Sequence, residues 1–135
     1  MSLEWRVKMI LSESDANWAS CLCSITADDG AGSLRNRGIG LVENKVFMAS
    51  GSYDMDTTDG FHVYRMTMDG TGCRLYVDGV ASPVLTGTLG AGAAISIEFG
   101  DETGCADAEY QTDYIRWTDG GAFAFPSTGT VIMIR

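Results

Sequence analysis

The strongest constraint on the fold is an alternation of apolar and polar residues that runs through most of the chain. Leu3, Trp5, Val7 and Met9 alternate with charged residues in the first such run, as they would along a half-buried strand. The spacing of an amphipathic helix is not sustained anywhere. With 17 Gly and only 2 Pro, the chain also suits many tight turns. We therefore predict an all-β, antiparallel β-sandwich or jelly roll of about ten short strands in two curved sheets.

The 135 residues suit a single domain spanning residues 1–135, long enough to bury a core without covalent staples. A polar loop is predicted at 52–60, and turns are predicted at 28–30 and 43–44. The strands after the first are predicted at 19–27, around 39–41, 45–49, both arms of a hairpin in 59–79, near 82–86, 95–99, 108–118 and 130–134.

The most informative stretch is DGFHVYRMTMDGTGCRLYVDG, residues 59–79. With the turn at 69–72, one side of the hairpin is apolar and carries Tyr64, Met66, Met68, Cys73, Leu75 and Val77. The other side carries Val63, Arg65, Thr67, Arg74, Tyr76 and Asp78. This second side is too polar for a sandwich interior, so it must meet solvent, a loop or a ligand.

This hairpin resembles the central hairpin of the LamG-like, concanavalin A-like lectin/glucanase superfamily, in which an aromatic-His-x-x-Arg strand leads into an LYVDG strand. IEFGD and TDYIRWTDGGAFAFP resemble the family's closing strands, so the similarity runs from Glu4 to Pro126. The resemblance implies a convex and a concave sheet, sugar or protein contacts on the concave face or its rim, and frequent calcium. It also implies an extracellular or periplasmic location.

If the polar side of the hairpin forms the concave face, the candidate ligand-binding residues lie on this side and on the strand at 108–118. Tyr76 offers a stacking surface, and Arg65 and Arg74 offer forked donors for hydroxyls or carboxylates. Tyr114 and Arg116 share one face of the later strand, whereas Asp113, Ile115 and Trp117 are predicted on the other. The alternative is that these residues form cross-strand pairs on a solvated sheet.

A catalytic site is not expected. The Glu-x-Asp-x-x-Glu strand of jelly-roll glucanases, whose carboxylates flank a glycosidic bond, does not occur, and Glu98 and Glu102 are the closest approach to it. His62 has no nearby Gln to complete the residue set of a polysaccharide lyase, and is expected to be structural. We therefore expect a non-catalytic carbohydrate-binding or adhesive module. The alternatives are a structural or protein-interaction domain without a small ligand and, third, a hydrolase or lyase.

The net charge of −9 argues against nucleic acid as a partner, because binding it requires a clustered positive surface. The acidic residues favour solubility or bind a cation. No cofactor is required, but calcium is possible at Asp54, Asp56 and Asp59 or at Asp101 and Asp107, since hard cations prefer oxygen clusters. The alternative is that both segments are ordinary solvated loops.

Three states of the four cysteines are open: free thiols, one or two disulfides, and a zinc site. The cysteines are Cys21, Cys23, Cys73 and Cys105. Cys21 and Cys23 share one strand face and cannot readily pair with each other. No apolar run of 18 residues predicts a membrane span, and no signal peptide is visible.

The tail TVIMI, residues 130–134, would be an aggregation hazard as a free strand, so we predict that it is paired. Pro126 and Gly129 provide a break after which the tail can leave the strand at 108–118 and cross to another edge. The resemblance implies an additional strand before residues 4–10, and the tail could take the place of that strand. The alternatives are pairing within a monomer and exchange or sheet extension in a homodimer.

Overall fold

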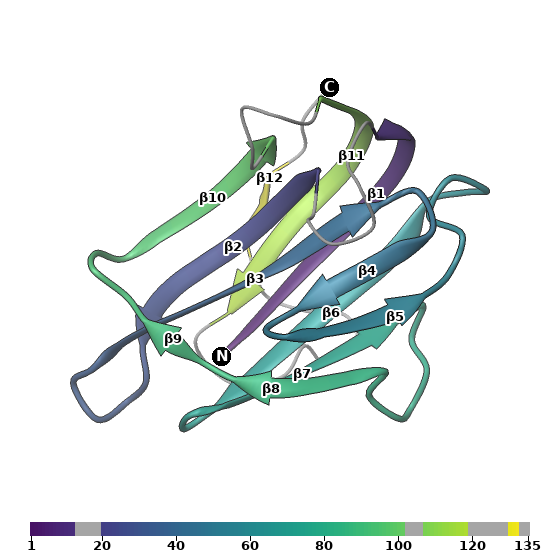
Figure 1. Ribbon diagram of the computed structural model, residues 1–135. Coiled ribbons are helices and arrows are strands. Elements are labelled where there is room, and N and C mark those ends of the chain that lie inside the picture. Colours follow the sequence, from purple (N-terminus) through teal and green to yellow (C-terminus); the bar gives the residue numbers. More distant parts are fainter. Residues whose placement is uncertain (13–19, 102–106, 119–129, 133–135) are drawn as a thin grey trace.

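The computed structural model is a sandwich of two antiparallel β-sheets (Figure 1). It describes residues 1–12, 20–101, 107–118 and 130–132. The strands in this part of the chain are β1 (Ser2–Ser12), β2 (Cys21–Asp28), β3 (Leu34–Val42), β4 (Lys45–Met48), β5 (Gly51–Asp54), β6 (His62–Asp69), β7 (Gly72–Val77), β8 (Leu85–Thr88), β9 (Gly90–Ala91), β10 (Ser96–Asp101), β11 (Ala108–Thr118) and β12 (Thr130–Ile132). The predicted all-β sandwich is confirmed.

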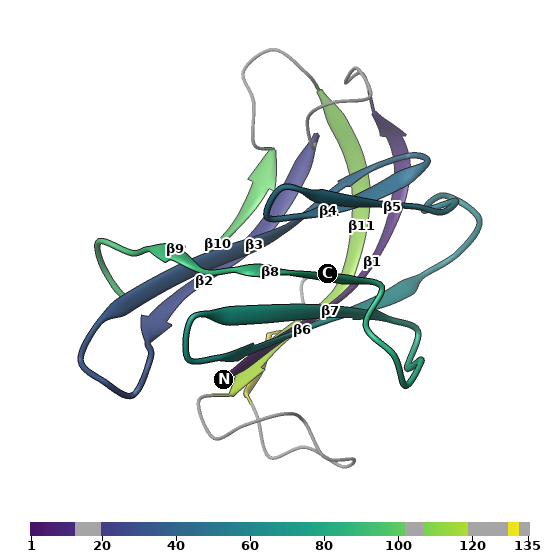
Figure 2. The same cartoon turned by 60° about the horizontal axis from the view of Figure 1, so that its bottom comes forward.

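Sheet A has the strand order β12-β11-β1-β6-β7-β8, and sheet B has the order β10-β2-β3-β4-β5, with β9 paired to β3. The sheets are stacked face to face (Figure 1). β8 ends at Thr88 in sheet A and β9 begins at Gly90 in sheet B, so the chain passes there from one sheet to the other (Figure 2). No helix in the described residues is long and apolar enough to cross a membrane.

The core lies between the sheets and is built largely from alternate residues of the longer strands. The predicted apolar face of β1 is fully buried and consists of Leu3, Trp5, Val7 and Met9. Residues of sheet B close the core from the other side, among them Cys21, Cys23, Ile25, Ile39, Leu41, Val46 and Met48. Burying each large apolar side chain stabilises the fold by about 1.5–3 kcal/mol relative to leaving it exposed.

The hairpin of β6 and β7 has the predicted register. Met68 faces Cys73, Met66 faces Leu75, and Tyr64 faces Val77. All six of these apolar side chains are buried, whereas those of the opposite side are exposed or partly exposed. The hairpin therefore buries one side in the core and presents its polar side on the outer face of sheet A, the surface turned away from sheet B.

A β-bulge in β11 changes the direction of one predicted side chain. Arg6 of β1 pairs with Tyr114, but the next residue, Val7, pairs with Thr112, so Asp113 is an extra residue. Its carboxylate forms an ion pair with Arg6 on the outer face of sheet A. The prediction that Asp113 shares the face of Ile115 was therefore wrong, because an extra residue breaks strict alternation.

Other predictions also needed correction. Residues 52–60 are not all loop, since Gly51–Asp54 form β5 at the edge of sheet B, where exposed side chains carry no hydrophobic signal. The strand predicted near 82–86 lies at Leu85–Thr88, after the turn that contains Pro83. The two-residue strand β9 was not predicted, because its pairing with β3 depends on a distant segment.

Among the described residues, the three buried cysteines form no disulfide, which agrees with the alternative of reduced thiols; they are Cys21, Cys23 and Cys73. Cys21 and Cys23 both point into the core, as the spacing predicted. Burial raises the pKa of the Cys23 thiol to about 12, so this thiol stays protonated at neutral pH. Cys105 lies outside the described residues.

The tail pairs with β11 in the same chain. Thr130, Val131 and Ile132 face Trp117, Arg116 and Ile115 respectively, so ordered pairing of these residues is confirmed. The predicted crossing to another edge was wrong, because β12 pairs antiparallel with β11, the strand that precedes it in the sequence. Residues 133 and 134, and the predicted break at Pro126 and Gly129, lie outside the described residues.

Deleting residues 128–135 is expected to give insoluble or partly unfolded protein. The deletion removes β12 and leaves the 11-residue β11 as an unprotected edge of sheet A. Size-exclusion chromatography and thermal unfolding would measure this effect. Deleting only residues 133–135, which keeps β12, is the control. A soluble, monomeric and equally stable 128–135 deletion would show that the tail is dispensable.

Candidate functional site

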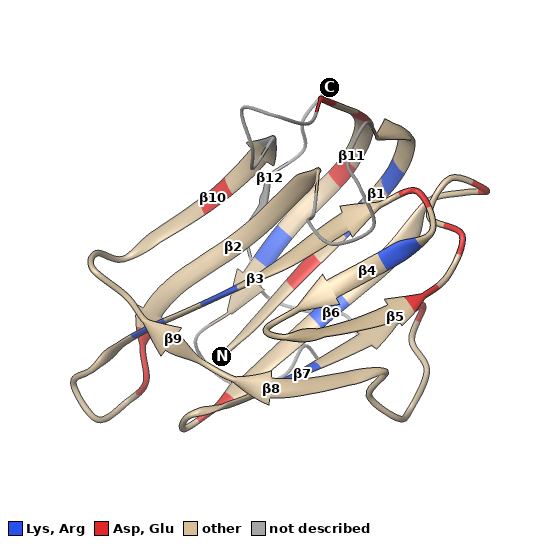
Figure 3. Cartoon of the chain, viewed as in Figure 1, with Lys and Arg blue, Asp and Glu red and all other residues tan. Residues whose placement is uncertain are grey.

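Polar side chains from four neighbouring strands meet in rows on the outer face of sheet A. The central row runs from β11 to β7 through Arg116, Glu4, Arg65 and Tyr76, each facing the next across a strand pair. In the adjacent row Arg74 of β7 faces Thr67 of β6. Figure 3 shows basic residues on β11, β1, β6 and β7, whereas many acidic residues lie in loops. All five predicted ligand-binding residues therefore lie on this one face.

Glu4 is the centre of this face, and its side chain is completely buried although it points away from the core. Arg65 Nε donates to Glu4 Oε2 at 2.9 Å, and Arg116 Nε donates to Oε1 at 2.8 Å. The Tyr114 hydroxyl also donates to Oε1, at 2.7 Å. Burial, followed by this contact with Glu4, raises the pKa of Tyr114 to about 12, which keeps the phenol protonated as a donor. One carboxylate thus fixes three of the five predicted residues.

A second contact group borders the Glu4 cluster and contains an aromatic residue that sequence reasoning did not select. The guanidinium of Arg6 forms the ion pair with Asp113 and lies 4.9 Å from the centre of the Phe61 ring. Phe61 is 38% exposed, so part of its surface remains accessible. Arg116 makes a similar contact with Tyr114, at 5.4 Å. The outer face of sheet A therefore interleaves arginines with three aromatic side chains, those of Phe61, Tyr76 and Tyr114.

The β7 side of this face is its most open part. Arg74 is exposed and Tyr76 is partly exposed, and the two lie two residues apart on one side of β7. Tyr76 faces Arg65, whose guanidinium is oriented by Glu4. The chemistry available here is stacking on a phenol ring and hydrogen bonding from planar guanidinium groups.

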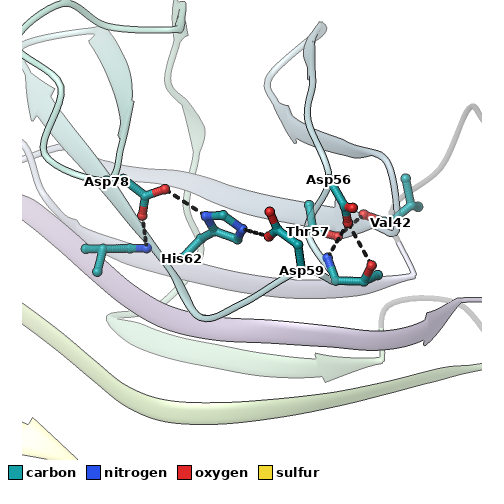
Figure 4. A network of polar contacts seen from close by, with 8 residues as sticks. Val42, Asp56, Thr57, Asp59, His62 and Asp78 are labelled. Carbon is teal, nitrogen blue, oxygen red and sulfur yellow. Dashed lines mark hydrogen bonds and ion pairs between the residues drawn. The ribbon is translucent and has the colours of Figure 1, made fainter.

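His62 lies at one end of the β6–β7 hairpin, between two carboxylates (Figure 4). Its Nδ1 is 2.7 Å from Asp78 Oδ2, and its Nε2 is 2.7 Å from Asp59 Oδ1. Burial is the largest single influence and lowers the pKa of His62. The hydrogen bonds and charges of Asp78 and Asp59 together outweigh burial, so the pKa lies above the ordinary 6.5. The imidazole therefore joins the 55–61 loop to the end of β7, in the structural role that the sequence predicted.

The carboxylates of the predicted calcium segment at 54–59 have separate partners. Asp54 forms an ion pair with Lys45 at 3.5 Å, and Asp56 accepts hydrogen bonds from the amide and hydroxyl of Thr58. Asp59 binds His62 instead. No group of three or more His, Cys, Asp or Glu side chains in the described part of the chain is arranged to hold a metal ion.

The second predicted calcium segment lies largely outside the described residues, which include neither 102–106 nor the side chain of Asp101. Asp107 is exposed. Calcium at this segment therefore stays a prediction.

Of the nearest match to a glucanase carboxylate pair, only Glu98 lies among the described residues. Glu98 faces Ser24 on the outer side of sheet B, and its carboxylate accepts a hydrogen bond from the Ser96 hydroxyl at 3.0 Å. Glu4 lies on the opposite outer face of the sandwich. Glu102 lies outside the described residues.

A pocket of about 350 Å³ lies at one end of the sandwich, away from the predicted site. Its lining includes Met1, Asp28, Met68 and Leu89. The Asp28 carboxylate accepts hydrogen bonds from the amides of Gly30 and Gly32, so it already stabilises the turn between β2 and β3. None of the predicted ligand-binding residues lines this pocket.

No protein-family model matches the sequence, and no curated protein matches it. The resemblance to the LamG-like, concanavalin A-like superfamily therefore stays a prediction, and the outer face of sheet A has to be interpreted from its own geometry.

Glu4, Arg6 and Phe61 are the residues of this face that sequence reasoning missed. Glu4 and Arg6 alternate with buried residues of β1, so their outward direction was legible in the sequence. Their partners were not, because Arg65 and Arg116 are 61 and 112 residues away along the chain. Phe61 precedes the first residue of β6, where alternation gives no signal.

Replacing Glu4 with Gln is expected to lower the free energy of unfolding by about 3 kcal/mol, because it removes the buried negative charge that pairs with two largely buried arginines. Denaturant unfolding would measure this loss. The matched control is Asp113→Asn, which breaks the Arg6 ion pair, whose side chains are 38% and 41% exposed. It should cost less than about 1 kcal/mol. Equal losses in the two variants would contradict the central role of Glu4.

Changing His62 to Gln is expected to reduce stability most at low pH. The folded-state pKa of His62 is raised, so its stabilising contribution is fully present below the unfolded value of 6.5 and is lost as pH rises through the folded value. The difference in unfolding free energy between wild type and variant should therefore shrink with increasing pH. Denaturant unfolding at a series of pH values would test this, and a difference that is constant or grows with pH would contradict it.

Proposed function

We propose that this protein is a non-catalytic carbohydrate-binding or adhesive module that binds its ligand on the outer face of sheet A. The observation that carries this proposal is the row of Arg116, Glu4, Arg65 and Tyr76, in which a buried carboxylate orients two guanidinium groups beside a partly exposed phenol ring. Side chains that are already fixed lose less entropy when a ligand binds. This pre-organisation supports recognition of a ligand with ring faces and hydroxyl groups.

In the proposed mode of binding, a sugar ring lies over β7 and β6. Tyr76 stacks against its apolar face, while Arg74 and Arg65 donate hydrogen bonds to hydroxyl or carboxylate oxygens. Phe61 and Tyr114 extend the surface across β1 and β11, so that more than one residue of a polymer could be contacted. The resemblance to concanavalin A-like domains supports this assignment and an extracellular or periplasmic location.

One observation favours the alternative of a structural or protein-interaction domain without a small ligand. Glu4 already satisfies donors of Arg65, Arg116 and Tyr114, which is the arrangement expected of cross-strand pairs on a solvated sheet. A glycan array distinguishes the two functions. Binding of at least one glycan would support the module proposed here, whereas no binding to any glycan would favour the interaction domain.

Replacing Tyr76 with Ala is expected to weaken glycan binding by about 1–3 kcal/mol, because a desolvated aromatic contact is lost. The control is Tyr53→Ala, which removes a 40% exposed tyrosine from β5 in sheet B. Affinities for a glycan selected on the array would be measured by titration calorimetry. If both variants bound as tightly as wild type, the ligand would not lie on the outer face of sheet A.

A further inference from the structure

The protonation state of His62 follows from geometry. Each of its two ring nitrogens lies 2.7 Å from a carboxylate oxygen, of Asp78 on one side and Asp59 on the other. An ionised carboxylate only accepts hydrogen bonds, so both nitrogens must donate. A neutral imidazole has one N–H and could serve one of these carboxylates only. The contacts in Figure 4 therefore require the imidazolium form.

The two carboxylates depend on His62 to different degrees. Asp78 has further anchors, since the Val63 amide donates to its Oδ1 at 2.8 Å and its own amide donates to the Val63 carbonyl at 2.9 Å. The carboxylate of Asp59 is 61% exposed, and His62 is its ion-pair partner. A neutral imidazole would therefore keep its hydrogen bond to Asp78 and release Asp59.

The first half of the 55–61 loop is held independently of His62. Thr57 is completely buried, its hydroxyl donates to the Val42 carbonyl at 2.7 Å, and its amide donates to the Glu43 carbonyl at 2.9 Å. The Met9 amide donates to the Thr57 carbonyl at 3.0 Å. The amide and hydroxyl of Thr58 donate to the Asp56 carboxylate, so Thr58 is also held independently of His62. The segment that depends on the contact between His62 and Asp59 is therefore 59–61, which ends in Phe61 and its contact with Arg6.

The charges around His62 favour its protonated form. Asp59 and Asp78 contact the ring, and Asp56 of the same loop acts at longer range. On β1 the residue that faces His62 is the apolar Val7, and the neighbouring Arg6 is paired with Asp113. On β6, Tyr64 lies beside the imidazole ring of His62. The Tyr64 phenol is uncharged at neutral pH, because burial raises its pKa above the ordinary value of 10. The acidic groups outweigh burial, so the raised pKa of His62 agrees with the geometry.

We propose that His62 is a proton-dependent latch for the segment 59–61. While both ring nitrogens are protonated, it holds this segment and places Phe61 against Arg6, and it releases the segment when one proton is lost. No covalent step is involved. The latch itself does not depend on the proposed function. Its consequence for ligand binding rests on that function: Phe61 belongs to the proposed ligand-binding face only while His62 is doubly protonated.

The test is an NMR titration of the intact protein without ligand, in buffer that contains a chelator. His62 is the only histidine, so one set of imidazole signals reports on it. We expect ¹⁵N shifts of a doubly protonated ring in mildly acidic buffer and a titration midpoint above 6.5. The ring current of Phe61 should shift the side-chain signals of Arg6 upfield, and this shift should decrease through the same midpoint. Phe61→Leu, which should abolish the shift at every pH, identifies its source.

Matched Asp→Asn variants test the role of Asp59. Asp59→Asn should move the midpoint of His62 downward and reduce the Arg6 shift even in acid. Asp54→Asn removes the same charge from an 86% exposed side chain of the preceding strand and should change neither quantity. A midpoint at or below 6.5, or an Arg6 shift that stays constant through the midpoint, would overturn the latch. Failure of the glycan array would overturn the proposed function and leave this result intact, so the two failures are distinguishable.

Discussion

The alternation of side chains along β1 is the constraint on which the rest of the structure depends. β1 lies inside sheet A between β11 and β6, so its two sides define both the core and the outer face. Its apolar side packs Trp5 and its neighbours against sheet B, and the Trp5 ring nitrogen donates to the Thr112 hydroxyl at 3.1 Å. The same backbone directs Glu4 and Arg6 outward. A shift of one residue in register would exchange these two sets, burying charges in the core.

The outer face of sheet A shows why a buried carboxylate can be useful on a surface. Desolvating Glu4 is unfavourable, and the attraction of two arginines and one tyrosine offsets that cost only in good geometry. In return, long guanidinium side chains that would otherwise move freely are held in one orientation. The cluster therefore contributes order to this face as well as stability.

The two ends of the β6–β7 hairpin have different roles. At the 69–72 turn, Gly70 has a φ of +56°, which glycine adopts without steric strain, so the chain can reverse there. At the other end Asp78 itself has a φ of +51°, an uncommon value for a residue with a side chain, and its carboxylate binds both the Val63 amide and His62. The hairpin's open end is thus held by a titratable contact, and it is there that the loop carrying Phe61 meets the outer face of sheet A.

The sequence by itself determined the class of fold, most strands, and the two sides of the hairpin, because a period of two is a local property that each strand carries in its own residues. It placed Arg65, Arg74 and Tyr76 on one side, and Tyr114 and Arg116 on one side of another strand. Only the tertiary structure decided that these two sides form one surface, centred on Glu4, because strand order and register join segments more than 60 residues apart. It also decided the direction of Asp113, through a bulge, and the pairing of the tail with β11, since neither has a local signal.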